Sequence, residues 1–378
     1  MIQGRVEGQA LVELDRIVPE VQAELLAVAG YGLTDRALPE VPVDPSRWMA
    51  FTTLIVEHRL AGLLARAVDD GAFAVTDEQA ADVALHHRNA IGICLCLDRE
   101  LLVLADALAE AGVRFVVLKG VGSACRFYAD PAERLYGDVD LLVDGRDFDR
   151  AAAVVAGLGG ERHRPDPQRG FVARFGKSAT FTLDGVWEVD LHRTFHLGPF
   201  GLAAGRHDLF VEPVAHVLVG GRPIPVPGPA TALISAAFHS VLPADDRRIV
   251  PLRDVAELLR PGRVDAGRAV ALAVEWQATI VLAAAVEAAT DLFDLPRWSP
   301  LQRWAATYQP SARERRWLSR HHDDRPAAYL LRTLDEVQAL GPASAGAAYV
   351  WASLRTASED DEPWSHRAAR LARVIRPG

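Results

Sequence analysis

Residues 114–144 read RFVVLKGVGSACRFYADPAERLYGDVDLLVD. The β-branched and aromatic run at the start predicts a short buried strand, and the glycines of the following segment 119–123 let the backbone turn sharply and approach a ligand. A second strand is predicted at residues 138–143. Because side chains alternate along a strand, Asp138 and Asp140 project from one face, where two carboxylates repel each other unless a cation lies between them. The order of these elements predicts a magnesium–phosphate site.

The composition is that of a globular protein with two or three domains. The chain has 378 residues, of which 50% are hydrophobic and 24% charged, and its formal net charge is −9. An acidic balance argues against a polynucleotide partner, which needs a dense basic face, but permits a single nucleotide. The sequence lacks a run of about 18 apolar residues and the apolar core of a signal peptide, so we expect a cytoplasmic protein without a membrane span. The oligomeric state is left open.

Only two of the 41 basic residues other than histidine are lysines, Lys119 and Lys177. Lys119 stands directly after the first predicted strand. Lys177 lies in a Gly-Lys-Ser sequence that resembles the end of a P-loop, but Phe171 occupies the place of the first glycine and strands flank the segment on both sides. We therefore do not interpret residues 171–178 as a P-loop.

Three regions are predicted along the chain: a helical N-terminal region (residues 1–111), a central core (112–205) and a mainly helical C-terminal region (206–378). In the first region, Asp44 or Ser46 is expected to cap a helix through residues 48–68, and Thr76 to start a long helix that ends near Gly112. The remaining N-terminal helix is expected within residues 11–29.

The central and C-terminal regions carry further signals. A helix is predicted over residues 147–157, an irregular segment over 161–170, and a hairpin of 171–183 and 186–191 around Asp184-Gly185. Four alternating prolines at 223–229 predict an extended connector. Helices are then expected over residues 230–241, 249–259, 265–292 with a break, 311–320, 327–340 and 365–375.

A third acidic residue, Asp190, lies in the second strand of the predicted hairpin. Transfer of a phosphoryl group by two metal ions uses carboxylates that hold the ions, and a third carboxylate that completes the coordination and helps to deprotonate the nucleophile. Asp138, Asp140 and Asp190 are the candidates for these positions, and Glu188, on the same strand face, could replace Asp190. His192 and His196 have the spacing of a helical metal pair, but the segment between them is expected to be a loop, so we do not predict a site there.

These motifs together resemble the DNA-polymerase-β-like nucleotidyltransferases, and more narrowly their uncharacterised nucleotidyltransferase branch. The residues that carry the resemblance are LKG at 118–120, the arginine Arg134 ahead of DVDLLV, and VDLH at 189–192. It extends weakly to AAFHSV and RDVAELL, where family members place a His and an Asp, here His239 and Asp254. The resemblance covers roughly residues 101–259.

The resemblance implies an α/β (α+β) fold with a mixed sheet flanked by helices, and Mg²⁺- or Mn²⁺-dependent transfer of a nucleoside monophosphate from an NTP, with ATP as the expected nucleotide. Asp138, Asp140 and Asp190 become the metal ligands and catalytic carboxylates. The expected nucleotide-binding residues are Lys119, Gly120, Gly122, Ser123 and Arg134. In the wider superfamily the Gly-Ser pair follows the first strand directly, whereas here Lys119-Gly120 stands at that place. Either Gly120 or Gly122-Ser123 can therefore meet the phosphates.

Several alternatives remain open. Arg134 can pair with an acidic neighbour, Glu133 or Asp130, instead of a phosphate. The Asp-x-Asp pair also fits a metal-dependent glycosyltransferase that uses a nucleotide sugar, although LKG and VDLH then have no role. A non-catalytic nucleotide-binding module of toxin–antitoxin type is the third hypothesis. The acidic net charge favours a small-molecule or a peptide or protein acceptor, and the sequence does not identify it.

Overall fold

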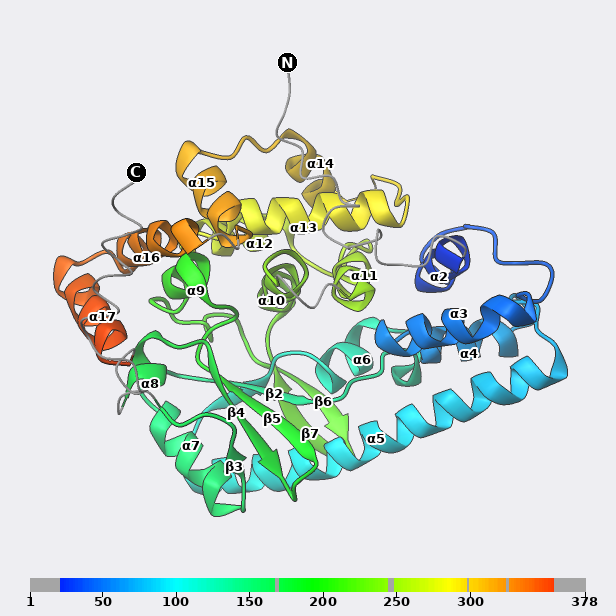
Figure 1. Cartoon of the computed structure of the whole chain (residues 1–378), viewed down its shortest axis with the longest axis horizontal. Coiled ribbons are helices and arrows are strands. Elements are labelled where there is room, and N and C mark those ends of the chain that lie inside the picture. The colour runs from blue at the N-terminus through cyan, green and yellow to red at the C-terminus, as the bar shows by residue number, and fades with distance from the viewer. Residues whose placement is uncertain (1–20, 167–169, 244–247, 298, 324–325, 357–378) are drawn as a thin grey trace.

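The computed structural model describes residues 21–166, 170–243, 248–297, 299–323 and 326–356. Its centre is a five-stranded sheet in the order β1 (Phe115–Val117), β2 (Val139–Val143), β5 (Trp187–His192), β4 (Ser178–Leu183) and β3 (Glu161–Arg162). The pair β2–β5 is parallel and the other pairs are antiparallel, so the sheet is mixed. Helices surround it (Figure 1), which confirms the fold class that the resemblance implied.

Two elements of the central region differ from the prediction. The predicted first hairpin strand is in fact a short helix, α8 (Phe171–Phe175), followed by β4. The segment expected to be irregular contributes β3, which pairs with the outer edge of β4. Glu161 and Arg162 lack the hydrophobic alternation of a strand, and only the free edge of β4 orders them.

Residues 215–226 form a separate two-stranded hairpin of β6 (Ala215–Val219) and β7 (Arg222–Val226). The prolines were expected to form a connector, but Pro223 and Pro225 belong to β7. Only alternate residues of a strand donate across one ladder, and the two prolines share one parity, so they are tolerated in a strand that pairs through β6. The hairpin lies against β1.

The N-terminal helices are α2 (Gln22–Ala29), α3 (Pro45–Glu57), α4 (Ala61–Asp69) and α5 (Asp77–Glu110). Asp44 caps α3 by accepting a hydrogen bond from the Ser46 N–H (2.8 Å), and Thr76 forms a capping box with Gln79 at the start of α5, as the sequence predicted. The single helix expected over 48–68 is interrupted between α3 and α4, where Arg59 adopts a φ of 58°. The predicted residues 11–20 lie outside the described part of the chain.

Shorter helices connect the strands. They are α6 (Val121–Phe127), the 3₁₀ turn η3 (Pro131–Glu133), α7 (Phe148–Gly157) and α9 (Gly198–Ala204). The C-terminal helices are α10 (Pro229–Val241), α11 (Ile249–Leu258), α12 (Ala266–Glu275), α13 (Thr279–Leu292), α14 (Pro300–Thr307), α15 (Ala312–His321), α16 (Pro326–Leu340) and α17 (Ala343–Thr356). The sequence prediction missed α14 and α17. The helix expected over 365–375 lies outside the described residues.

Two hydrophobic cores organise the molecule. One packs α5 and α7 against the sheet and the β6–β7 hairpin. The other joins the N-terminal helices with the C-terminal helices, which lie above the sheet in Figure 1. No described helix is long and apolar enough to cross a membrane. The division into regions 1–111, 112–205 and 206–378 stays a prediction.

Candidate nucleotide site

The parallel pairing of β2 and β5 brings the predicted carboxylates together. Asp140 and Asp190 are register partners on neighbouring strands, and Asp138 directly precedes β2. Asp140 is buried at 1% exposure, while Asp138 and Asp190 are more accessible. Parallel strand pairing thus brings Asp140 and Asp190 side by side although fifty positions separate them in the sequence.

Lys119 lies between the two carboxylates of the Asp-x-Asp pair. Its ammonium nitrogen is 3.1 Å from Asp140 Oδ2 and 3.4 Å from Asp138 Oδ2. Burial opposes the charge of Lys119, but the negative charges of Asp140 and Asp138 outweigh it and raise its pKa. Burial likewise opposes the charge of Asp140, yet Lys119 and a hydrogen bond from His192 hold the pKa of Asp140 well below its usual range. The lysine therefore supplies a positive charge within the carboxylate cluster.

His192 joins the cluster from the end of β5. Its Nε2 is 2.9 Å from Asp140 Oδ1 and 3.8 Å from Asp190 Oδ2. Because an ionised carboxylate only accepts hydrogen bonds, Nε2 carries the proton that bonds Asp140. No metal pair of His192 and His196 was predicted from the sequence. In the structure His196 contacts His321 instead, with ring centroids 5.2 Å apart. The signal missed was the strand alternation within VDLH, which puts Asp190 and His192 on one face.

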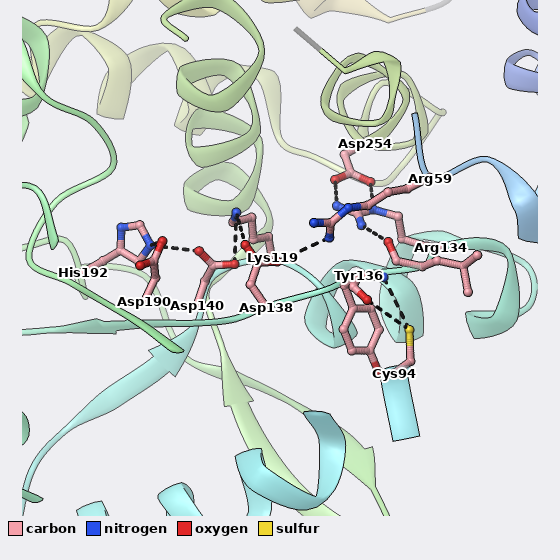
Figure 2. A network of polar contacts seen from close by, with 11 residues as sticks. Arg59, Cys94, Lys119, Arg134, Tyr136, Asp138, Asp140, Asp190, His192 and Asp254 are labelled. Carbon is pink, nitrogen blue, oxygen red and sulfur yellow. Dashed lines mark hydrogen bonds and ion pairs between the residues drawn. The ribbon is translucent and has the colours of Figure 1, made fainter. Parts of the chain in front are cut away.

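One ligand atom each from Asp140, Asp190 and His192 lie within 4.8 Å of one another. The two carboxylates fit a divalent cation, because carboxylate oxygens suit Mg²⁺ or Mn²⁺. His192 would join them as a ligand only through a nitrogen without a proton, so with Nε2–H bonded to Asp140 it orients that carboxylate instead. Asp138 lies on the other side of Asp140 and pairs with Lys119 and Arg59 (Figure 2). The structure thus brings all three predicted carboxylates to one site, and their role as metal ligands stays a prediction.

Arg59 reaches the site from the break between α3 and α4. Its Nη1 is 3.4 Å from Asp138 Oδ1, and its guanidinium packs on Gly137, where a Cβ would lie 3.1 Å from Nη2. Gly137 leaves room for this approach. Arg59 was not predicted, because its helical surroundings in the sequence give no sign that the helix breaks there.

Arg134 is buried and makes a two-pronged ion pair with Asp254. Its Nε–H and Nη2–H donate to the two carboxylate oxygens at 2.9 and 2.8 Å, and Tyr128 donates to the same carboxylate at 2.8 Å. Burial opposes the guanidinium charge, but Asp254 raises the pKa of Arg134. The acidic partner is neither of the expected neighbours, since Glu133 pairs with Arg66 and Asp130 caps η3. Phosphate contact by Arg134 stays a prediction.

The segment between Arg134 and Asp138 is held from below by α5. The Tyr136 N–H donates to Cys94 Sγ and the Cys94 thiol donates to the Tyr136 carbonyl, both at 3.4 Å (Figure 2). The Tyr136 hydroxyl donates to Asp98 at 2.6 Å. Cys94 is therefore a packing and positioning residue.

A pocket of about 310 Å³ opens beside these residues. Its lining combines acidic and basic side chains with a short backbone segment: Arg59, Lys119, Gly120, Arg134, Tyr136, Gly137, Asp138, Lys177, Glu188, Asp190, His239, Arg248, Val250 and Pro251. Both lysines of the chain belong to it. Burial and the nearby Asp190 raise the pKa of Glu188, while burial and Lys119 hold the pKa of His239 well below its usual value.

The two candidate phosphate segments occupy different places. Gly120, with a φ of 63°, lines the pocket. Gly122 and Ser123 are buried within α6, where a Cβ on Gly122 would lie 3.0 Å from Val226 Cγ1, and neither lines the pocket. Which segment binds phosphate stays a prediction, and the geometry favours Gly120. Lys177 and Arg248 enter the pocket from the α8–β4 connection and from the start of α11. A reach of Lys177 from the hairpin into the site was a weak expectation of the sequence, whereas nothing local indicated Arg248.

Three comparisons with known proteins place the chain among its relatives, and the family comparison agrees with the motifs. A crystal structure of an antigenic nucleotidyltransferase-like protein from Paracoccidioides brasiliensis is similar over 50% of this chain and 92% of that chain, with 16% identity and a TM-score of 0.30. No curated relative matches the sequence. The family described as uncharacterised nucleotidyltransferase matches residues 44–294, more than half of the chain and all of the site described above. The chain therefore belongs to the uncharacterised nucleotidyltransferase family.

Proposed function

We propose that the protein transfers a nucleoside monophosphate from an NTP, with ATP as the expected donor, to a small-molecule or a peptide or protein acceptor in the cytoplasm. The observation that carries the proposal is the composition of the pocket. Asp138 and Asp190 line a cavity whose basic side chains can neutralise a polyphosphate, and the buried Asp140 lies beside Asp190, with which it can hold a cation. An NTP with its divalent ion matches both sets of charges, because the ion binds the carboxylates and the phosphates bind the basic side chains.

The proposed reaction is a single displacement. An oxygen nucleophile of the acceptor forms a bond to the α-phosphorus while the bond between that phosphorus and the bridging oxygen of the β-phosphate breaks, and pyrophosphate leaves. The proton of the acceptor goes to a carboxylate, for which we propose Asp190, held by a hydrogen bond from Thr180 and reached by His192. No oxidant or further reactant is needed.

Within this scheme, Asp140 and Asp190 would hold a divalent ion, with Asp138 as a further carboxylate. When bound, such an ion neutralises phosphate charge and polarises the phosphorus centre. The residues of the chain do the rest: Lys119, Lys177 and Arg59 attract and orient the phosphate oxygens, and His192 fixes the orientation of Asp140.

The direct test uses two batches of each NTP, labelled at the α- or at the γ-phosphorus, incubated with the protein, Mg²⁺ and a cell extract. Nucleotidyl transfer moves the α-label to an acceptor and releases the γ-label as pyrophosphate. Asp140→Asn should reduce the transfer by about 100-fold or more, because it removes a charge from the centre of the site. The control Asp106→Asn alters an exposed carboxylate of α5 outside the pocket and should transfer as the wild type does.

Three outcomes reject the proposal. Transfer of the γ-label shows a kinase. Binding of UDP-sugars in preference to all plain NTPs shows a glycosyltransferase. Nucleotide binding that needs no metal and is unchanged by Asp138→Asn shows a non-catalytic nucleotide-binding module.

A further inference from the structure

Three arginines are buried among the described residues, and they differ in how their charge is balanced. Arg134 pairs with Asp254, and Arg253 pairs with Glu257 at 2.8 Å. Arg193, only 7% exposed, pairs with no carboxylate of the described residues. A buried charge without a counter-ion is costly, and a bound anion would supply the missing charge.

The hydrogen bonds of Arg193 use only part of its guanidinium. Nε–H donates to the Gly176 carbonyl at 2.9 Å and Nη1–H to the Gly205 carbonyl at 3.2 Å, while the buried Nη2 has no hydrogen-bond partner among the described residues. Gly205 lies so close that a Cβ there would be 2.4 Å from Nη1. The two carbonyls fix the plane of the guanidinium and leave one donor nitrogen for a partner outside the fold.

Arg193 lines a second cavity, of about 620 Å³, that shares no lining residue with the nucleotide pocket. Three further arginines, Arg146, Arg174 and Arg206, line the same cavity. Two of its three acidic residues have partners within the fold, since Asp144 accepts two hydrogen bonds from the Arg146 guanidinium and Asp208 accepts one from the Phe210 N–H. The third, Asp149, leaves one carboxylate against the four arginines of the lining. We call this cavity the Arg193 pocket.

The Arg193 pocket lies next to the nucleotide pocket along the chain and in space. The Arg193 N–H donates to the Lys177 carbonyl at 2.8 Å, and Lys177 lines the nucleotide pocket. Arg193 follows Asp190 by three residues, a distance of about 10 Å along an extended strand. The backbone of Gly176 and Lys177 therefore separates the two cavities.

We propose that the Arg193 pocket is a second binding site, which takes a small molecule through a carboxylate or phosphate group bound to Arg193. A guanidinium binds both groups through its N–H donors, and the neighbouring arginines add positive charge at the mouth. Burial lowers the pKa of Arg193 to about 10, so the side chain is still charged at neutral pH and still needs an anion.

The test uses inorganic phosphate and acetate as separate probes, without nucleotide or metal, so its result is independent of the proposed nucleotidyl transfer. At about tenfold its dissociation constant, the bound anion should raise the melting temperature by about 2–4 °C relative to chloride at the same ionic strength. Arg193→Met should lose this shift. Arg88→Gln, which removes an exposed guanidinium from α5, should keep it. A larger shift with one probe identifies that group as the ligand chemistry.

A crystal soaked in selenate places the anion directly, because selenium has an anomalous signal. Selenate against Arg193 supports the proposal, and selenate confined to the pocket of Lys119 and Lys177 overturns it. The absence of a shift with both probes in the wild type, or an unchanged shift in Arg193→Met, also overturns it. If Arg193→Met does not fold, Arg206→Gln, an exposed lining residue, should weaken the shift severalfold and decides the question instead.

Discussion

At the scale of single residues, the site depends on charges whose partners lie far away in the sequence. Lys119 balances Asp138 and Asp140, and Asp254 on α11 balances Arg134, which begins the segment that leads into the strand of the Asp-x-Asp pair. The buried pair between Arg134 and Asp254 fixes this approach segment, because removing either partner leaves an uncompensated charge out of water.

Arg134→Met should therefore lower the free energy of unfolding by about 3–5 kcal/mol. Urea denaturation followed by circular dichroism measures the change. The control Arg222→Gln breaks the solvent-exposed ion pair with Asp106 and should leave the midpoint unchanged. Equal midpoints for Arg134→Met and the wild type would show that the buried pair does not hold this segment.

Lys177 is the residue-scale test of the pocket. Lys177→Met should weaken MgATP binding by about 10- to 100-fold, because a charge-assisted contact to phosphate is lost. Lys177→Arg keeps the positive charge and should restore most of the affinity. Isothermal titration calorimetry measures both. A dissociation constant for Lys177→Met equal to that of the wild type would remove this lysine from the proposed phosphate contacts.

At the scale of elements, close helix contacts position the carboxylate strand. Gly62 on α4 packs on η3 so tightly that a Cβ would lie 2.1 Å from the Ala132 carbonyl oxygen and 2.8 Å from Glu133 Cα. The contact is with backbone, which cannot rotate aside, and η3 directly precedes Arg134. The spacing of α4 from the nucleotide site thus depends on the absence of a side chain.

Gly62→Ala should destabilise the protein by roughly 1–3 kcal/mol as α4 and η3 move apart. The matched control is Gly92→Ala in the interior of α5, where a Cβ meets nothing within 4 Å, and better helix propensity should make this change neutral or slightly stabilising. Thermal unfolding of both variants checks the difference. Stability changes of the same sign and size in the two variants would show that the close contact of α4 with η3 does not determine the stability.

Buried histidines make the packing of the C-terminal helices sensitive to acid. His321 ends α15 and its Nε2 lies 2.9 Å from the Leu242 carbonyl at the end of α10. Burial lowers the pKa of His321 to about 4, below its usual value near 6.5 in the unfolded chain. The contribution of neutral His321 to the free energy of unfolding is fully present above about pH 6.5. It is lost as the pH falls toward the pKa of His321 in the folded protein, because the unfolded chain takes up the proton first.

At pH 5, protonation of His321 in the unfolded chain should lower the free energy of unfolding by about 2 kcal/mol relative to pH 7. His321→Gln, which keeps a donor for the carbonyl but does not titrate, should lose correspondingly less stability over the same interval. Urea midpoints at the two pH values measure the effect in both proteins. Parallel losses would show that His321 is not the titrating group.

At the scale of the whole molecule, the nucleotide pocket is assembled from all parts of the described chain. Arg59 comes from the N-terminal helices, Lys119 and Asp190 from the sheet, and His239 and Arg248 from the C-terminal helices. A ligand bound there contacts both hydrophobic cores, so binding should stabilise the fold as one unit.

MgATP should accordingly raise the melting temperature, and removal of the divalent ion with EDTA should abolish the increase. The reason is that ATP alone brings its own negative charge to Asp138, Asp140 and Asp190. Differential scanning fluorimetry with and without the chelator measures this. An increase that persists in EDTA would mean that the basic side chains alone hold the nucleotide.

The local pattern of the sequence determined the helices with strong caps, the two strands around the Asp-x-Asp pair, and the identity of the three carboxylates. Those features depend on propensity, alternation and capping within a few residues, which a single sequence contains. Residues 161–162 and 171–175 were interpreted wrongly because their structure depends on a neighbouring strand edge and on packing.

Only the tertiary structure decided which charges meet. The parallel register of β2 and β5 brought His192 to Asp140. The interruption between helices α3 and α4 brought Arg59 to Asp138, and α11 supplied Asp254 as the partner of Arg134. It also showed that both lysines line one pocket and that Arg193 is buried without a carboxylate among the described residues. Electrostatic pairing acts through space, so sequence separation holds no record of it until the chain is folded.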